Sequence, residues 1–173
     1  FFNFLDYREE QKQYILLLPD LLKKVYGRTP KACIFTYGCQ QNVSDSERIK
    51  GMLTQVGYEL TDEAEGADFV LFNTCAVRGH AEDRVYGNIG AMKHYKKRHN
   101  GMIIALCGCM AQQEIVIDRM KKSYPYVDIV FGTHVQYRLP EFLYKRLSGS
   151  SRIFEIGESE KIVEEIPVKR DGR

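Results

Sequence analysis

Three cysteine motifs, each placed just after a short apolar run, most constrain how this chain of 173 residues can fold. The motifs are TYGCQQN around Cys39, NTCAVR around Cys75 and GCMAQ around Cys109. The preceding runs, residues 32–35, 69–72 and 102–106, have the composition of buried strands. If they are parallel strands of one sheet, their carboxyl ends share an edge, where such sheets bind ligands. The pattern therefore predicts that the three thiols meet there.

The remaining chain alternates predicted helices with predicted strands. Apolar residues at helical spacing predict helices over about residues 44–56, 81–98, 112–123 and 139–147, and further strands at residues 127–131 and 152–156. Ser44 and Glu47 are expected to form a capping box at the start of the first of these helices. We expect an α/β fold with an open, mainly parallel sheet of about five strands, right-handed crossovers and helices on both faces, as in flavodoxin-like proteins.

Three segments follow from this pattern. Residues 1–30 lie outside the alternation and are interpreted as an N-terminal helical extension, which Pro19 is expected to break. Residues 31–156 form the predicted α/β domain. From residue 157 the composition becomes strongly charged, so residues 157–173 are interpreted as a linker or edge segment that leads to another domain.

Composition limits the partners. No apolar stretch approaches the roughly 18 residues that span a bilayer, and the N-terminus lacks the order of a signal peptide, so we expect a cytoplasmic protein without a membrane partner. The formal net charge is +2, so bulk electrostatics indicate neither nucleic acid nor an anionic membrane. Five cysteines in such a chain favour reduced thiols with ligand or catalytic roles over a disulfide framework.

Three converging thiolates suggest a metal site. Structural zinc commonly takes four ligands from local C-x-x-C pairs, and the sequence contains no such pair. Iron-sulfur clusters are commonly held by four cysteines, so three would leave one iron without a protein ligand and open to chemistry. Cys33, inside the first strand, is interpreted as core. Cys107 is expected on the same side as Cys109, with a supporting or dispensable role.

The three motifs, together with Gly132-Thr133-His134 after the fourth predicted strand, resemble the N-terminal domain of MiaB-type tRNA methylthiotransferases of the radical-SAM family. The resemblance covers roughly residues 31–147. It implies that Cys39, Cys75 and Cys109 hold an auxiliary 4Fe-4S cluster with one open iron. It also implies a separate radical-SAM domain, which carries a second 4Fe-4S cluster and binds S-adenosylmethionine. The implied reaction places a methylthio group on carbon 2 of an isopentenylated adenosine beside the tRNA anticodon.

The radical-SAM part is missing from this sequence, because its cysteines cannot form C-x-x-x-C-x-x-C. We therefore expect the fragment alone to be inactive. The resemblance implies tRNA and cluster-assembly or sulfur-supplying proteins as partners, and we expect a monomer. Gln40, Asn73 and Arg78 flank the thiols and are candidates to donate hydrogen bonds to the cluster or substrate, or simply to cap loops.

A basic run near the end of the second predicted helix is a candidate tRNA contact. It contains Lys93, Lys96, Lys97 and Arg98. Cations at a helix C-terminus also favour the helix dipole, so a solvated helix end is the favoured explanation of the run. A phosphate contact would instead make binding sensitive to salt.

Other functions stay open at this stage. Methylthiotransferases of this kind also act on threonylcarbamoyladenosine in tRNA or on a ribosomal protein. A binding module stabilised by structural zinc would unfold when its metal is chelated. A flavodoxin-like nucleotide or redox domain is a further alternative, although the sequence lacks both a glycine-rich phosphate loop and a C-x-x-C pair.

Overall fold

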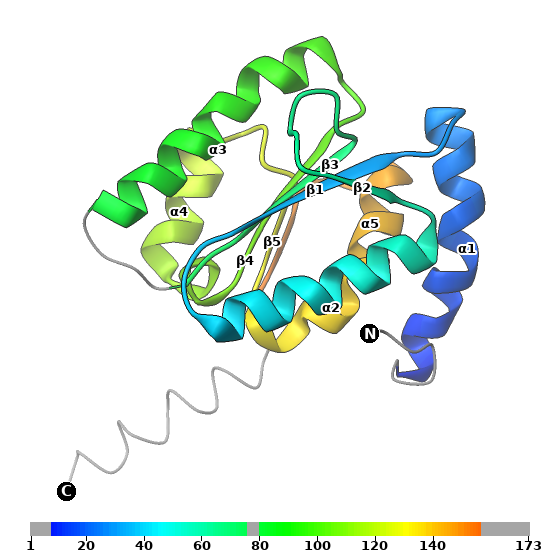
Figure 1. The fold of residues 1–173 in the computed structure, drawn as a ribbon, viewed down its shortest axis with the longest axis horizontal. Coiled ribbons are helices and arrows are strands. Elements are labelled where there is room, and N and C mark those ends of the chain that lie inside the picture. Colours follow the sequence, from blue (N-terminus) through cyan, green and yellow to red (C-terminus); the bar gives the residue numbers. More distant parts are fainter. Residues whose placement is uncertain (1–7, 76–79, 157–173) are drawn as a thin grey trace, which may run out of the picture.

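A six-stranded parallel sheet forms the centre of the molecule (Figure 1). The computed structural model describes residues 8–75 and 80–156. In spatial order the strands are β2 (Glu59–Thr61), β1 (Lys31–Thr36), β3 (Phe69–Asn73), β4 (Ile103–Cys107), β5 (Ile129–Phe131) and β6 (Ile153–Glu155). The helices are α1 (Glu9–Tyr26), α2 (Gln40–Val56), α3 (His80–Arg98), α4 (Glu114–Ser123) and α5 (Leu139–Leu147). The expected open α/β sheet with helices on both faces is confirmed.

Helices cover both faces of the sheet because the central strands are apolar on both sides. Phe69 and Leu71 of β3 point into a core shared with α1, α2 and α5, whereas Val70 and Phe72 point into a core shared with α3 and α4. This alternation follows from the two-residue period of a strand. Burial of each large side chain stabilises the fold by roughly 1.5–3 kcal/mol. No helix among the described residues is long and apolar enough to cross a membrane.

One crossover differs in hand from the others. The connections β3–α3–β4 and β4–α4–β5 both move from β3 toward β5, and their helices lie on the same face of the sheet. The connection β1–α2–β2 moves in the opposite direction, and α2 lies on the other face. These three share one hand. The connection β5–α5–β6 moves along the sheet in the same direction as the connections through α3 and α4. Helix α5, however, lies on the face of α2, so this crossover has the opposite hand. The expectation of uniformly right-handed crossovers is therefore wrong for β5–α5–β6, where packing against α1 holds α5 on this face.

Two helices differ from the sequence prediction. Helix α1 continues through Pro19, although proline removes one helical hydrogen bond. Leu18 and Leu22 are completely or almost completely buried on either side of it, and this tertiary contact outweighs the local preference. Helix α2 begins at Gln40, so Ser44 and Glu47 lie inside the helix and do not cap it. The short edge strand β2 was not predicted.

Two buried aspartates organise the amino edge of the sheet. Asp68, just before β3, accepts hydrogen bonds from Arg28, His99 and the backbone N–H of Lys31. Burial would raise the pKa of Asp68, but these hydrogen bonds lower it below its usual value. Asp128, just before β5, accepts hydrogen bonds from a lysine of α3 and an arginine of α5. It also accepts one from the backbone N–H of Ile104 in β4. The two carboxylates therefore tie helix ends to strand starts.

Candidate metal centre

The three predicted cysteines follow adjacent strands at the same height. Thr36, Asn73 and Cys107 lie side by side in one row across β1, β3 and β4. Cys75 and Cys109 each come two residues after this row, and Cys39 comes three residues after it. Because the strands are parallel, all three cysteine loops leave the sheet at its carboxyl edge. The topology thus places the three cysteine loops at the edge of the sheet where the motifs predict them.

Hydrogen bonds continue between the loops beyond the last paired residues of the strands. The backbone N–H of Tyr37 donates to the carbonyl oxygen of Asn73 at 2.8 Å, and that of Thr74 donates to the carbonyl oxygen of Cys107 at 3.0 Å. The first bond joins the loop of Cys39 to the loop of Cys75. The second joins the loop of Cys75 to the strand that leads to Cys109. Backbone hydrogen bonds therefore link the segments that carry the three thiols to one another.

A glycine before two of the cysteines permits this close approach. Gly38 has φ +120° and Gly108 has φ +98°, which side chains other than hydrogen rarely tolerate. A Cβ atom on Gly38 would lie 2.7 Å from Cys75 Sγ, and one on Gly108 would lie 2.0 Å from the carbonyl oxygen of Thr74. Both distances are shorter than any real contact of this kind. The Gly-Cys pairs in the first and third motifs therefore bring the loops together.

The three thiols are accessible and influence one another. Cys39 and Cys109 are exposed, and Cys75 is partly exposed. Burial and then the charges of Cys39 and Cys109 raise the pKa of Cys75, an effect that requires the three sulfur atoms to lie near each other. Hydrogen bonds from the backbone N–H groups of Asn42 and Gln41 lower the pKa of Cys39, which is the N-cap of α2. The start of α2 thus favours the thiolate form.

Three sulfur donors at one edge are the kind of donor that iron-sulfur clusters use. Among residues 8–75 and 80–156, no group of three His, Cys, Asp or Glu side chains lies close enough to bind one ion. In a cluster each cysteine binds a different iron atom, so the sulfurs surround the cluster and stand further apart than the ligands of one ion. All five cysteines are free thiols. The donor set and its exposure are compatible with a cluster.

A buried polar network supports the loops of Cys39 and Cys75. Asn73 Nδ2 donates to the carbonyl oxygen of Asn42 at 2.9 Å and to Ser46 Oγ at 2.8 Å, and Asn42 Nδ2 donates to Asn73 Oδ1 at 3.1 Å. Asn42 Oδ1 accepts from the backbone N–H of Cys39 at 3.3 Å and lies 3.6 Å from its Sγ. Thr36 Oγ1 completes the network through Ser46. These groups connect the beginning of α2 to the end of β3.

The other predicted neighbours of the thiols have different outcomes. Asn73 uses its amide within this network, so it positions the loops and does not bond to a thiol. Gln40 is exposed beside Cys39 and makes no side-chain hydrogen bond to the described residues. Arg78 lies outside the described residues. Asn42 was missed, although its position three residues after Cys39 is typical of a helix-capping partner.

Cys33 and Cys107 belong to the core. Burial raises the pKa of Cys33 to about 11, and it also strongly raises the pKa of Cys107. Cys107 points into the core shared with α1, α2 and α5, whereas Cys109 is exposed in the 3-10 turn η2 (Cys109–Gln112). The expectation that both turn to the same side is wrong, because Gly108 ends the strand alternation between them.

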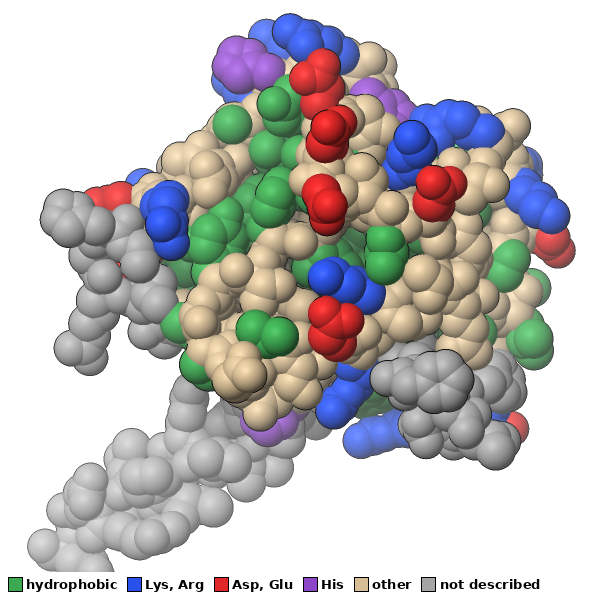
Figure 2. Space-filling view, viewed as in Figure 1, with side chains coloured by type: hydrophobic (Ala, Val, Ile, Leu, Met, Phe, Trp, Pro, Cys, Tyr) green, Lys and Arg blue, Asp and Glu red, His purple; other side chains and the backbone are tan. Residues whose placement is uncertain are grey.

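The predicted basic run lies at the opposite edge from the cysteines. Helix α3 follows β3 and leads to β4, so its last turn lies near the amino ends of the strands. Lys96 is partly buried there, with Nζ 2.5 Å from Asp128 Oδ2 and 2.9 Å from the carbonyl oxygen of Tyr126. Lys96 is therefore engaged within the fold, whereas Lys93, Lys97 and Arg98 are exposed. Charged side chains of both signs are scattered over the face in Figure 2.

Comparisons with known proteins agree with the three motifs. The chain matches the family described as "Uncharacterized protein family UPF0004" over residues 31–132. It is 44% identical over 164 residues to a tRNA-2-methylthio-N(6)-dimethylallyladenosine synthase of Thermoanaerobacter sp. (strain X514), which covers 94% of the chain and 35% of that relative. Relatives with the same name from Clostridium perfringens and Halalkalibacterium halodurans are 48% identical over 139 residues and 42% identical over 158 residues. These alignments cover 80% and 91% of the chain.

The matches confirm the resemblance to tRNA methylthiotransferases that the cysteine motifs indicated. The chain spans about a third of the length of the curated relatives it matches, between 29% and 35% in these three alignments. The matched part is their N-terminal region.

Proposed function

The chain belongs to the UPF0004 family, and on this basis we propose that it is the cluster-holding N-terminal part of a tRNA methylthiotransferase. The proposed substrate is an adenosine beside the anticodon that carries an isopentenyl group, also called dimethylallyl, on N6. The relatives are named for this nucleoside, which favours it over threonylcarbamoyladenosine or a ribosomal protein.

One observation carries the proposal: Cys39, Cys75 and Cys109 follow three adjacent parallel strands and converge at one edge. We propose that they hold a 4Fe-4S cluster with one iron left free of protein ligands. When bound, the cluster would supply the sulfur that becomes the methylthio group.

The surrounding residues would prepare these ligands. The N-terminus of α2 stabilises the Cys39 thiolate, so less free energy is needed to deprotonate this ligand. Gly38 and Gly108 allow the loops to approach, and the amides of Asn42 and Asn73 hold two loops at a defined separation. Exposure of Cys39 and Cys109 leaves the site open toward a substrate.

The rest of the reaction would require other parts of the protein. Residues 1–173 contain no C-x-x-x-C-x-x-C motif, so the second cluster and the S-adenosylmethionine site are proposed to lie in a radical-SAM domain outside this sequence. We propose residues 31–156 as the cluster domain, residues 1–30 as its helical extension and residues 157–173 as the connection to that domain. The proposed setting is a cytoplasmic monomer that receives its cluster from assembly proteins.

Anaerobic reconstitution tests the cluster. Incubation of the chain with iron and sulfide should incorporate about four irons per chain and produce the broad visible absorption of a 4Fe-4S cluster. Alanine at Cys39, Cys75 or Cys109 should abolish this absorption, whereas Cys33→Ala should retain it because Cys33 lies in the core. Equal loss of iron in Cys33→Ala and the other variants would contradict the proposal, as would stable binding of one zinc in place of iron.

The substrate is tested with the full protein that contains this chain. tRNA with the isopentenylated adenosine should gain the mass of a methylthio group on that nucleoside, detected by mass spectrometry after digestion. Modification of a threonylcarbamoyl nucleoside instead would overturn the substrate assignment and leave the cluster assignment intact.

A further inference from the structure

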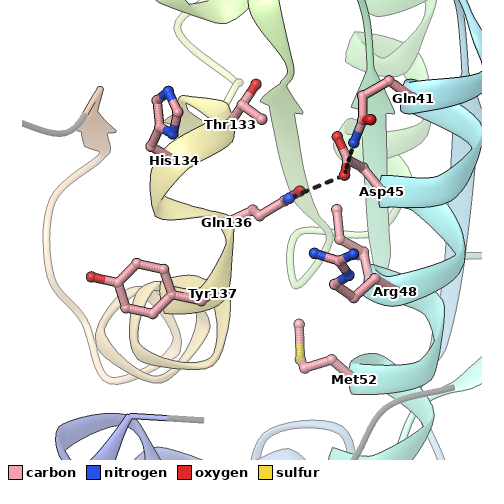
Figure 3. Close-up of a pocket in the computed structure, with 9 residues that line it drawn as sticks. Gln41, Asp45, Arg48, Met52, Thr133, His134, Gln136 and Tyr137 are labelled. Atoms are coloured by element: carbon pink, nitrogen blue, oxygen red, sulfur yellow. Dashed lines mark hydrogen bonds between the residues drawn. The ribbon is translucent and has the colours of Figure 1, made fainter. Parts of the chain in front are cut away.

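Asp45 on α2 is a buried carboxylate without a cationic partner among the residues that the structure describes. Its side chain accepts hydrogen bonds from Gln41 Nε2 at 3.0 Å and from Gln136 Nε2 at 3.3 Å (Figure 3). The residue is only 4% exposed. Buried carboxylates are rarely left without a positive partner, because neutral donors compensate only part of the lost hydration. The two amides hold Asp45 in place and leave its charge uncompensated.

Arg48 lies on the same side of α2 and does not compensate this charge. Oppositely charged residues three apart on a helix often pair, yet Arg48 makes no ion pair or hydrogen bond with Asp45 or with any other described residue. Figure 3 shows its guanidinium group directed into the gap between α2 and the 3-10 turn η3 (Thr133–Arg138). A buried carboxylate with neutral donors only and an exposed guanidinium thus line one gap without pairing with each other.

The gap is a cavity of a size suited to a small molecule. Its volume is about 320 Å³, within the roughly 300–1,000 Å³ of typical ligand pockets. Ile49, Met52 and the ring of Tyr137 contribute apolar lining. Thr133 also lines the cavity, and its Oγ1 is shielded from solvent without a hydrogen-bond partner among the described residues. The cavity therefore combines two opposite charges, an unused hydroxyl and an apolar wall.

The cavity adjoins the cysteine edge. Gln41 is in the first turn of α2, two residues after Cys39. On the opposite wall, the backbone N–H of Thr133 donates to Oε1 of Gln112, at the end of the turn that begins with Cys109. Ligands of open parallel sheets bind at this carboxyl edge. A molecule in the cavity would therefore lie beside two of the three cysteine loops.

We propose that this cavity binds a zwitterionic α-amino acid with an unbranched apolar side chain. Its ammonium group pairs with Asp45, its carboxylate pairs with Arg48, and its side chain packs against Met52. A simple anion such as phosphate would be repelled by Asp45, and a simple cation would be repelled by Arg48, so neither class is attracted by both charges. The amino acid is either free or the terminal group of a larger molecule such as S-adenosylmethionine. The proposal does not depend on the cluster, so each can fail separately.

Binding is tested on the chain without metal, in reductant, by two-dimensional NMR and calorimetric titration. L-methionine should bind and shift amide resonances of α2 and η3. Its decarboxylated and deaminated analogues should each bind at least about tenfold more weakly, since each loses one charged hydrogen bond. S-adenosylmethionine distinguishes the two sources: tighter binding than methionine supports the larger molecule, and equal or weaker binding supports the free amino acid.

Substitutions locate the two charges. Arg48→Gln should reduce methionine affinity to that of the decarboxylated analogue without changing binding of that analogue. Asp45→Asn should reduce methionine affinity to that of the deaminated analogue without changing binding of that analogue. Lys50→Gln, which changes a cation on the same helix outside the cavity, should have no effect. Because Arg48 is exposed, its variant should fold normally and decides the matter even if Asp45→Asn is unstable. Absence of binding by both probes, methionine binding that survives Arg48→Gln, or an analogue that binds as tightly as methionine would overturn the proposal.

Discussion

Asn42 and Asn73 hydrogen-bond to each other across the loops that carry two of the candidate cluster ligands. Asn42 Nδ2 donates to Asn73 Oδ1 at 3.1 Å, and Asn73 Nδ2 returns a bond to the carbonyl oxygen of Asn42 at 2.9 Å. Both residues are buried. Since Cys39 and Cys75 lie at the ends of this connection, it sets the separation of their loops.

Asn73→Ala should therefore weaken both the fold and the site. It leaves the buried Nδ2 of Asn42 without its partner and removes one of the two hydrogen bonds of Ser46 Oγ, which costs about 1–3 kcal/mol of unfolding free energy in urea denaturation. Asn88→Ala, which removes an exposed amide bonded to Tyr37, is the control and should change stability little. If both variants were equally stable, the network would not support the loops.

Gly108→Ala should be far more damaging than Gly66→Ala. Both glycines have positive φ, so both substitutions carry backbone strain, and Gly108, with φ +98° and ψ −174°, lies in a region that essentially only glycine adopts. A Cβ on Gly66 meets nothing within 4 Å, whereas one on Gly108 lies 2.0 Å from the carbonyl oxygen of Thr74. The urea midpoint should therefore be lower for Gly108→Ala, through the clash and the backbone strain together, and iron incorporation should fall only in that variant. Similar midpoints would mean that the loops do not need this close approach.

The cysteines should react with an alkylating reagent in a defined order when no metal is bound. Hydrogen bonds from Asn42 and Gln41 lower the pKa of Cys39, while burial and neighbouring thiolates raise the pKa of Cys75. The thiolate is the nucleophile, so Cys39 should be labelled before Cys75 at neutral pH. Cys33 and Cys107 should be labelled only after unfolding, because both are buried. Peptide mass spectrometry over a time course measures this order, and faster labelling of Cys75 would contradict it.

Glu141 should make the fold sensitive to acid. Burial would raise the pKa of Glu141, but hydrogen bonds from Arg138, Lys145 and Gln11 lower it from its ordinary value of 4.5 to about 2. A lowered pKa in the folded state means that the ionised form stabilises the fold. This contribution is complete above the ordinary pKa and is lost as pH falls toward about 2.

Urea denaturation at a series of pH values between neutrality and acid measures this dependence. Glu141→Gln should flatten the decline in unfolding free energy over that window. Glu47→Gln, at an exposed position on α2, is the matched control and should leave the decline unchanged. A decline of equal slope in wild type and Glu141→Gln would refute the assignment.

Lys96 and Lys97 should have different roles despite being adjacent. Lys96→Met removes an ion pair to the buried Asp128 and should lower the unfolding free energy by about 1–3 kcal/mol, because Arg146 still pairs with that carboxylate. Lys97→Met should leave stability unchanged. If the exposed part of the basic run binds tRNA, Lys97→Met should weaken tRNA binding in a filter assay and reduce its salt dependence. Unchanged binding would identify the run as a solvated helix end.

The alternation of helices with five of the six strands, and the placement of the three cysteines after strands, could be predicted from the sequence. Continuous apolar runs such as residues 69–72 and 102–106 suit a sheet covered on both faces, and this pattern is local. The cysteine motifs themselves were sufficient to indicate the family, as the comparisons confirm. The polar residues after each run marked the edge at which a site was to be expected.

Tertiary contacts decided what the sequence pattern could not. Pro19 stays inside α1 because Leu18 and Leu22 are buried around it, and Lys96 is withdrawn from solvent because Asp128 lies across the sheet edge. Both outcomes depend on packing against elements that are distant in sequence. Sequence periodicity determined which side chains face a core, because this depends on the repeat of a single helix or strand. The direction of Asn73 toward Asn42, the approach of Gly38 to Cys75 and the unpaired charges of one cavity arose only when separate elements packed together.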